Sequence, residues 1–184
     1  MIREVRSVAT SMQAIDAEGR TVTGYASVYR SPSRVLSDSR GRKFRERILP
    51  GAFDRSLASR ADVVFLFNHA RSALLGRTTS GTLRLFSDDT GLGMELRLPE
   101  TTLARDLAEL MRRGDLREMS FAGFVTRDAW AQGEDGTPER SVMEWALEDV
   151  SLVTRAAYPA AYSNLRTADA LESLEIAKRR FALL

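Results

Sequence analysis

The sequence predicts an α+β fold, built mainly from an antiparallel β-barrel or sandwich with a few helices packed around it. Short segments rich in β-branched and aromatic residues recur along the chain, and a hairpin pattern joins two of them. Helical periodicity appears only in isolated segments. The regular alternation of strand and helix that is typical of a doubly wound sheet does not occur, so strands joined by hairpins are expected to dominate.

The first third of the chain predicts strands separated by polar connections. A strand is expected over 21–29, and the polar stretch 30–43 that follows predicts an exposed loop. A second, short strand is expected over 44–48. A turn at 49–51 and one or two helical turns over 51–59 complete this part.

A β-hairpin is predicted around Asp88-Asp89-Thr90-Gly91. Its strands are expected over 82–86 and 92–98, where β-branched and aliphatic residues flank the turn. This is the clearest local signal in the sequence.

A helix is predicted to begin after a cap at Thr101 or Thr102 and to run to Arg113, with Gly114 ending it. Apolar residues recur at helical spacing within it. The buried stripe is expected to consist of Leu103, Leu107, Leu110 and Met111.

The last part of the chain predicts two strands, over 118–126 and 142–154, joined through a flexible loop over 131–138. We expect one domain over residues 1–166, followed by an amphipathic helix or tail over 167–184.

The composition narrows the chemistry that the chain can perform. It has no cysteine and one histidine, which excludes a disulfide framework, a thiol nucleophile and zinc sites built from thiolates or several histidines. No window has the apolar length of a membrane span and the amino terminus lacks a secretory signal, so a soluble, cytoplasmic protein is expected.

Nucleic-acid binding is not expected. Basic and acidic residues nearly balance, 27 against 25, and the arginines are scattered instead of forming one stripe. A weaker hypothesis of DNA binding would rest on Arg40, Arg42, Arg45 and Arg47.

His69 is the candidate general base, because histidine alone has an unperturbed pKa close to the pH of the cytoplasm. Residues 62–69 alternate so that His69 falls on the same face as Val63, Phe65 and Phe67, at the end of an apolar row. Taken by itself, a lone histidine at a strand end is more often a structural residue.

Ser120 is the candidate nucleophile. Alternation over 118–126 places Met119, Phe121 and Val125 on one face of a strand and Ser120 on the other. The surroundings differ from the Gly-x-Ser-x-Gly motif of the α/β-hydrolases. A strand serine bonded to the backbone would explain the position as well.

The candidate for the acid that orients the histidine is Asp149 or Glu148. Alternation places Asp149 on the apolar face with Trp145 and Leu147, which makes it the more interior carboxylate. A buried carboxylate needs a partner, and a histidine N–H would serve and would fix the imidazole tautomer. An ion pair with an arginine is the alternative.

Several segments, taken in order, resemble the prohead protease family of tailed phages and gene transfer agents. They are Gly24-Tyr25-Ala26-Ser27-Val28-Tyr29, Glu46-Arg47-Ile48-Leu49-Pro50-Gly51-Ala52-Phe53, Asn68-His69, Leu75-Gly76-Arg77-Thr78, Met119-Ser120-Phe121-Ala122-Gly123-Phe124, Asp149-Val150-Ser151-Leu152-Val153-Thr154 and Ala157-Tyr158-Pro159-Ala160. The resemblance implies a fold shared with the herpesvirus assembly proteases. It also implies Ser120 as nucleophile, His69 as base and Asp149 as acid, at a place where family members often have the longer Glu.

The resemblance further implies a serine endopeptidase that needs no cofactor or metal. Its substrate would be the scaffolding segment of the major capsid protein, inside the assembling procapsid in the bacterial cytoplasm, and the enzyme would also cleave itself. Analogy with the herpesvirus enzymes suggests a homo-oligomer. The alternative is a non-enzymatic β-barrel that helps capsid assembly or binds the scaffold.

Overall fold

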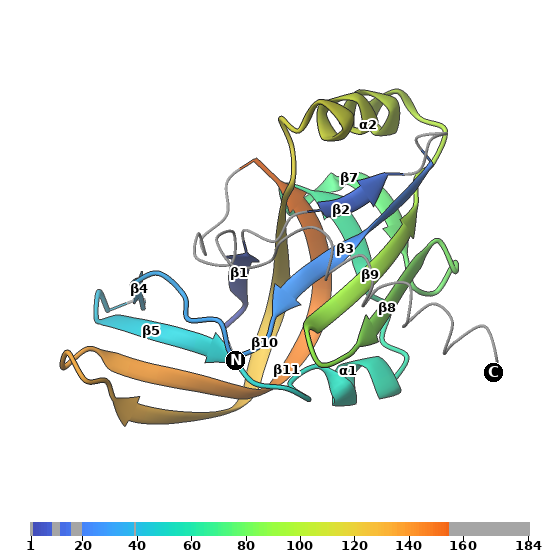
Figure 1. Cartoon of the computed structure of the whole chain (residues 1–184). Coiled ribbons are helices and arrows are strands. Elements are labelled where there is room, and N and C mark those ends of the chain that lie inside the picture. Colours follow the sequence, from blue (N-terminus) through green and yellow to red (C-terminus); the bar gives the residue numbers. More distant parts are fainter. Residues whose placement is uncertain (1, 9–11, 16–19, 39, 155–184) are drawn as a thin grey trace.

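The computed structural model describes residues 2–8, 12–15, 20–38 and 40–154, and this part of the chain is mostly β-sheet with two helices (Figure 1). The helices are α1 (Asp54–Ala58) and α2 (Thr102–Arg113). The strands are β1 (Glu4–Val8), β2 (Met12–Ile15), β3 (Thr21–Val28), β4 (Leu36–Ser37), β5 (Lys43–Ile48), β6 (Val64–Phe67), β7 (Ala70–Arg77), β8 (Leu83–Ser87), β9 (Gly91–Arg97), β10 (Glu118–Gln132) and β11 (Pro138–Val153).

The strands form two sheets. One has the order β1-β10-β11-β5-β4, with β6 pairing β11 and β7 pairing β6, and the other has the order β2-β3-β9-β8. Most pairs are antiparallel, as expected, but β11 runs parallel to β5 along its first half and to β6 along its second half. The pairings of the described residues do not close a barrel. Of the two architectures expected from the sequence, a barrel or a sandwich, the structure therefore shows two separate sheets and not the barrel.

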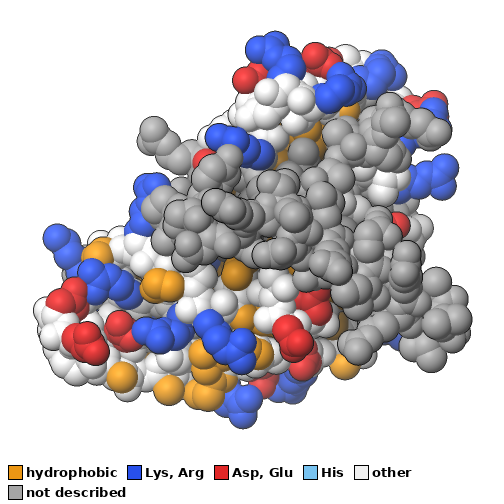
Figure 2. Space-filling model, in the orientation of Figure 1, with side chains coloured by type: hydrophobic (Ala, Val, Ile, Leu, Met, Phe, Trp, Pro, Cys, Tyr) orange, Lys and Arg blue, Asp and Glu red, His pale blue; other side chains and the backbone are white. Residues whose placement is uncertain are grey.

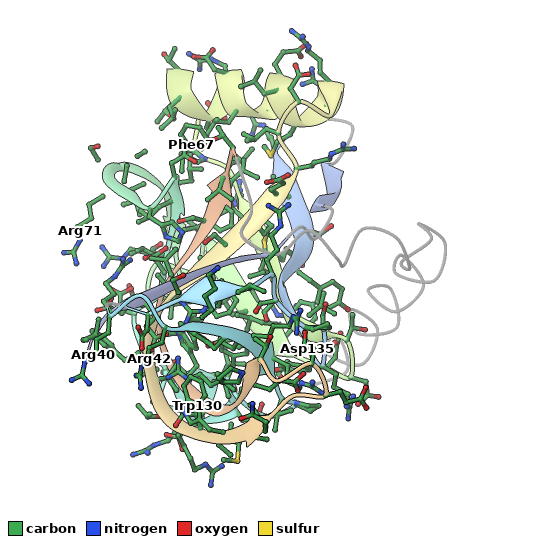
Figure 3. The ribbon with its side chains drawn as sticks, turned by 90° about the vertical axis from the view of Figure 1, so that its left-hand side faces the viewer. Arg40, Arg42, Phe67, Arg71, Trp130 and Asp135 are labelled. Carbon is green, nitrogen blue, oxygen red and sulfur yellow. The ribbon has the colours of Figure 1, made fainter. Side chains whose placement is uncertain are left out.

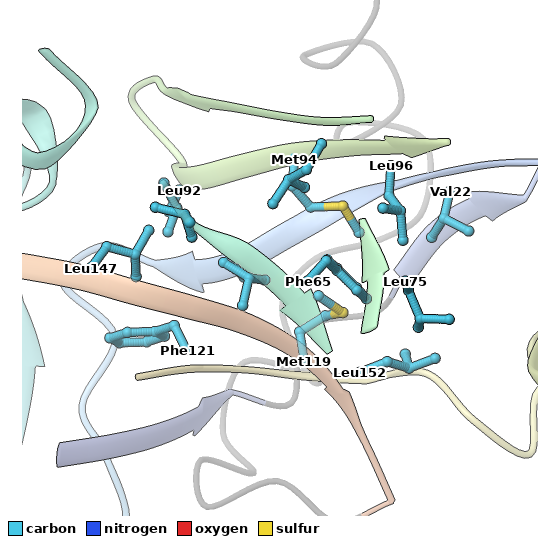
Figure 4. Close-up of a cluster of buried hydrophobic side chains, with 14 of the residues drawn as sticks. Val22, Phe65, Leu75, Leu92, Met94, Leu96, Met119, Phe121, Leu147 and Leu152 are labelled. Atoms are coloured by element: carbon cyan, nitrogen blue, oxygen red, sulfur yellow. The ribbon is translucent and has the colours of Figure 1, made fainter. Parts of the chain in front are cut away.

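One hydrophobic core lies between the two sheets (Figure 4). Side chains of β3 and β9 meet side chains of β6, β10 and β11 there. The fully buried members include Phe65, Leu92, Met94, Met119, Phe121, Trp145 and Leu152. α2 lies over one end of the sheets and α1 lies near the other end (Figure 1), so the helices cover the core at its two open ends.

The predictions with strong local signals are confirmed. The hairpin of β8 and β9 forms around a turn in which the Asp88 carboxylate accepts hydrogen bonds from the backbone of Thr90 and Gly91. The hydroxyl of Thr101 caps α2, and Gly114 ends it in the left-handed conformation at φ 79°. Leu110, expected in the buried stripe of α2, is 36% exposed.

The structure also has strands that the sequence did not predict, namely β1, β2, β4 and β7. β10 continues to Gln132 and β11 begins at Pro138, so residues 133–137 form the connection and the strands extend only into the two ends of the loop expected over 131–138. The expected helix or tail over 167–184 lies outside the described residues.

Candidate active site

A register shift between β10 and β11 determines where the acidic residue lies. Ala122 pairs with Asp149, whereas the next residue, Gly123, pairs with Leu147, so Glu148 is an extra residue on β11. The extra residue shifts the alternation of β11, so the side chains that face the core have odd numbers directly before the bulge and even numbers after it. Leu147, Val150 and Leu152 belong to the core, whereas Asp149 and Ser151 do not. The expectation that Asp149 shares the face of Trp145 and Leu147 is therefore wrong.

Gly123 permits the close approach of the two strands at this shift. A Cβ atom at Gly123 would lie 2.0 Å from the carbonyl oxygen of Ala146 and 2.8 Å from Nε1 of Trp145. Any side chain would therefore push β10 away from β11, within a few residues of Ser120 and Asp149.

His69 does not continue the apolar row of β6, contrary to the sequence expectation. The strand ends at Phe67, and Asn68 and His69 have φ angles of 51° and 57°, which form a left-handed turn into β7. The backbone N–H of Asn68 donates to the carbonyl of Leu152 at 2.9 Å, and its side-chain oxygen accepts from the N–H of Thr154 at 3.1 Å. These bonds fix the turn to β11 and bring the imidazole to the outer face of the sheet.

The structure brings Ser120, His69 and Asp149 into one chain of contacts. Nε2 of His69 lies 2.5 Å from Oγ of Ser120, and Nδ1 lies 2.6 Å from Oδ1 of Asp149. Asp149 is 3% exposed and Ser120 has no exposed surface. The shorter side chain of Asp therefore reaches the imidazole directly. The arrangement lets Asp149 accept a hydrogen bond from Nδ1–H and leaves Nε2 free to accept the proton of the Ser120 hydroxyl.

Glu148, the alternative acid, points to a different partner. Its Oε2 lies 2.9 Å from Nε of Arg3, at the protein surface. Of the two carboxylates, Asp149 is the one within hydrogen-bond distance of His69.

Three groups that the sequence did not single out surround these residues. Oγ of Ser151 lies 3.0 Å from Oδ1 of Asp149 and 3.2 Å from Nδ1 of His69. The guanidinium of Arg3 forms an ion pair with the other oxygen of Asp149. The carbonyl of Arg6 accepts a hydrogen bond from Ser120 at 3.1 Å. Arg3 and Arg6 escaped prediction because they lie more than a hundred residues from their partners.

The surroundings keep Asp149 ionised. Burial alone would raise the pKa of this carboxyl group, but the hydrogen bond and charge of His69, the hydroxyl of Ser151 and the charge of Arg3 together lower the pKa below its usual range. A carboxylate that stays charged stabilises the imidazolium that forms when His69 takes up a proton.

The chain matches the family model described as caudovirus prohead serine protease over residues 7–174 of its 184 residues. It belongs to the prohead serine protease family of the tailed phages. No curated protein and no solved structure matches the chain significantly.

A prohead serine protease is a hydrolase that acts in capsid maturation, with capsid protein as its substrate, inside the assembling procapsid. Family membership decides against the alternative of a non-enzymatic assembly module. Among the described residues, no helix is long and apolar enough to cross a membrane, and no group of three or more acidic or histidine side chains could hold a metal ion.

A groove of about 590 Å³ adjoins the site of this prohead protease. His69 and Asp149 form part of its wall, and the groove runs over β6 and β7 on the outer face of the sheet. Its wall also includes Arg3, Glu148 and Arg71, and Arg71 projects away from the ribbon (Figure 3).

Proposed function

We propose that Ser120 is the nucleophile of this protease, that His69 is its general base and that Asp149 orients His69. The observation that carries the proposal is the unbroken chain of contacts at 2.5 and 2.6 Å that links the hydroxyl, the imidazole and the carboxylate. His69 is also the chain's one histidine. The order base, nucleophile, acid along the sequence differs from the orders of chymotrypsin, subtilisin and the α/β-hydrolases.

In the proposed mechanism, Oγ of Ser120 forms a bond to the carbonyl carbon of the substrate peptide while its proton passes to Nε2 of His69. The resulting imidazolium is stabilised by Asp149 through Nδ1–H. When the C–N bond breaks, Nε2 returns the proton to the leaving amine. A water molecule then attacks the acyl-enzyme in the same way and releases Ser120.

We further propose that the substrate is the scaffolding segment of the major capsid protein of a tailed phage or gene transfer agent, and that the enzyme also cleaves itself. Residues 1–166 would form the catalytic domain, with a fold like that of the herpesvirus assembly proteases, and residues 167–184 a helix or tail. Charges of both signs are interspersed over the face in Figure 2. Arg42, Arg45 and Arg47 each pair with a carboxylate, which favours a protein over a nucleic acid as partner.

Purified Ser120→Ala and His69→Ala variants test the catalytic assignment. Each should lower kcat/KM for cleavage of the capsid precursor by at least roughly a thousandfold. Ser120→Ala removes the attacking hydroxyl, and His69→Ala removes the group that takes up its proton. Ser80→Ala, which removes the hydroxyl of an exposed serine, is the matched control and should cleave at the normal rate. A fluorophosphonate probe should label wild-type Ser120, identified by mass spectrometry of the labelled peptide.

Normal processing by the Ser120→Ala variant, with circular dichroism showing a native fold, would refute the assignment. Labelling of another serine in the wild-type protein would refute it as well.

A further inference from the structure

The floor of the groove beside His69 is aliphatic. Val64 and Leu66 on β6 alternate with Phe65, which belongs to the core, so they lie on the outer face. In the parallel register of β6 and β11, Val64 is opposite Asp149 and Leu66 is opposite Ser151. The floor therefore begins directly beside the acid of the proposed catalytic residues.

Leu74 extends this floor and is open to solvent. It pairs with Leu66 across β6 and β7, and it is 45% exposed, while its neighbour Leu75 lies in the core. The solvent face of a sheet normally carries polar side chains. Leu66 is only 3% exposed, so Leu74 is the exposed aliphatic side chain of this floor and the place where another apolar group can add a contact.

The charges at the rim are largely matched with one another. Arg77 pairs with Asp62 at one end of the groove, and Arg3 pairs with Glu148 and Asp149 at the other. These pairs leave the aliphatic floor and the guanidinium of Arg71, which forms no ion pair with the described residues, as the features available for recognition. The volume of about 590 Å³ is in the range of peptide and small-molecule sites, so the groove can hold a side chain together with part of its backbone.

The substrate is the occupant that the geometry favours. The groove opens at His69, and the same imidazole contacts Oγ of Ser120 through its other nitrogen. In the register of the sheet, Leu74 is three strands away from Ser120, through Leu66 and Ser151, which is about 14 Å at the usual strand spacing. A peptide placed for attack by Ser120 therefore reaches the floor of the groove with a residue a few positions away from its scissile bond.

We propose that this groove binds an aliphatic side chain of the substrate, a few residues away from the scissile bond, and that Leu74 determines this specificity. The inference rests on the proposed catalytic role of Ser120 and His69 and adds the chemical class of the recognised residue. Leu74 contributes no group to the chemistry itself. Its contact with the substrate is the same in the ground state and in the transition state, so its loss raises KM and leaves kcat unchanged.

Leu74→Ala tests the proposal, with Leu110→Ala as the matched control, because Leu110 is an exposed leucine on α2. The cleaved bond of the capsid precursor is first mapped by mass spectrometry of the products. Leu74→Ala should then raise KM about tenfold, as expected for uncovering one aliphatic contact, with kcat within twofold of wild type. Leu110→Ala should leave both constants unchanged.

A substrate series completes the test. Each aliphatic residue within four positions of the cleaved bond is replaced by Ser, and both enzymes are assayed. One replacement should weaken cleavage by the wild type about tenfold and by Leu74→Ala much less, because the two changes remove the same contact. The proposal is overturned if no substrate position is coupled to Leu74, or if Leu74→Ala and Leu110→Ala behave alike. Fluorophosphonate labelling of Ser120 shows whether the catalytic assignment or the groove assignment has failed. The labelling persists when only the groove assignment is wrong.

Discussion

At the scale of single residues, each oxygen of the Asp149 carboxylate has its own partners. Oδ1 faces Nδ1 of His69 at 2.6 Å and Oγ of Ser151 at 3.0 Å, and Oδ2 faces Arg3. A carboxylate held on both oxygens keeps one orientation, and it fixes the tautomer of His69 that leaves Nε2 open to Ser120. A longer side chain at this position would need a different backbone position to make the same contacts.

The lowered pKa of Asp149 predicts how stability depends on pH. Because the pKa in the folded protein lies below the usual 3.8, the charged carboxylate stabilises the fold above that pH, and this stabilisation is lost as pH falls through the lowered pKa. Asp149→Asn should therefore be less stable than wild type by about 2 kcal/mol at pH 7, and the difference should narrow below pH 4. Urea unfolding between pH 3 and pH 7 measures it.

Asp106→Asn, which changes an exposed carboxylate on α2, is the control for this measurement and should unfold like wild type throughout. A difference between wild type and Asp149→Asn that stays constant down to pH 3 would contradict the prediction.

At the scale of elements, the sequence predicts those whose signals are local. The cap at Thr101, the stop at Gly114 and the turn at Asp88 act within a few residues of themselves, so α2 and the hairpin of β8 and β9 could be placed. The bulge at Glu148 arises from pairing with a strand more than twenty residues away. Alternation alone therefore identified Asp149 as the interior acid but assigned it to the wrong face.

The candidate site shows the same division. Ser120, His69 and Asp149 could be selected by residue type and by resemblance. The turn at His69 could not be predicted from the sequence. The left-handed conformation of Asn68 and His69 is held by hydrogen bonds of Asn68 to Leu152 and Thr154, which are distant in the chain. Strand β1 has too little apolar periodicity to be predicted, and its position depends on pairing with β10.

Arg3 lies in the segment that leads into β1. Removal of its charge is predicted to change the pH profile of kcat/KM. Arg3→Met keeps the length of the side chain but removes the charge beside Asp149, whose remaining partners are His69 and Ser151. Without this positive charge, protonation of the coupled catalytic residues at acid pH is less opposed, so the acidic limb of the kcat/KM profile should move to higher pH. Because the side chain of Arg3 is 38% exposed, we expect a loss of kcat of only about two- to fivefold at pH 7.

Cleavage rates of the capsid precursor between pH 4 and pH 9 provide this profile. Arg112→Met, which breaks an exposed ion pair with Glu109, is the matched control and should leave the profile in place. An acidic limb that does not move in Arg3→Met would show that Arg3 is only a surface contact.

At the scale of the whole molecule, the central strands connect distant parts of the fold. β10 and β11 run from the site to an extension, where β11 pairs with β5 (Figure 1). The buried carboxylate of Glu46 on β5 binds Arg6 of β1 and Arg140 of β11. The carbonyl of Arg6 in turn accepts a hydrogen bond from Ser120. The position of the Ser120 hydroxyl therefore depends on the packing of three strands.

The burial of Ser120 predicts that access to it requires an opening of the fold. The residue has no exposed surface, whereas attack requires the substrate carbonyl within about 3 Å of Oγ. Opening exposes surface, so urea favours it. The rate constant for fluorophosphonate labelling of Ser120 should therefore rise with urea at concentrations below the unfolding transition, followed by tryptophan fluorescence in the same samples. Hydrolysis of the probe without protein, measured at each urea concentration, corrects for any effect of urea on the reactivity of the probe. A labelling rate that stays flat or falls up to the transition would mean that the hydroxyl is reached without such an opening.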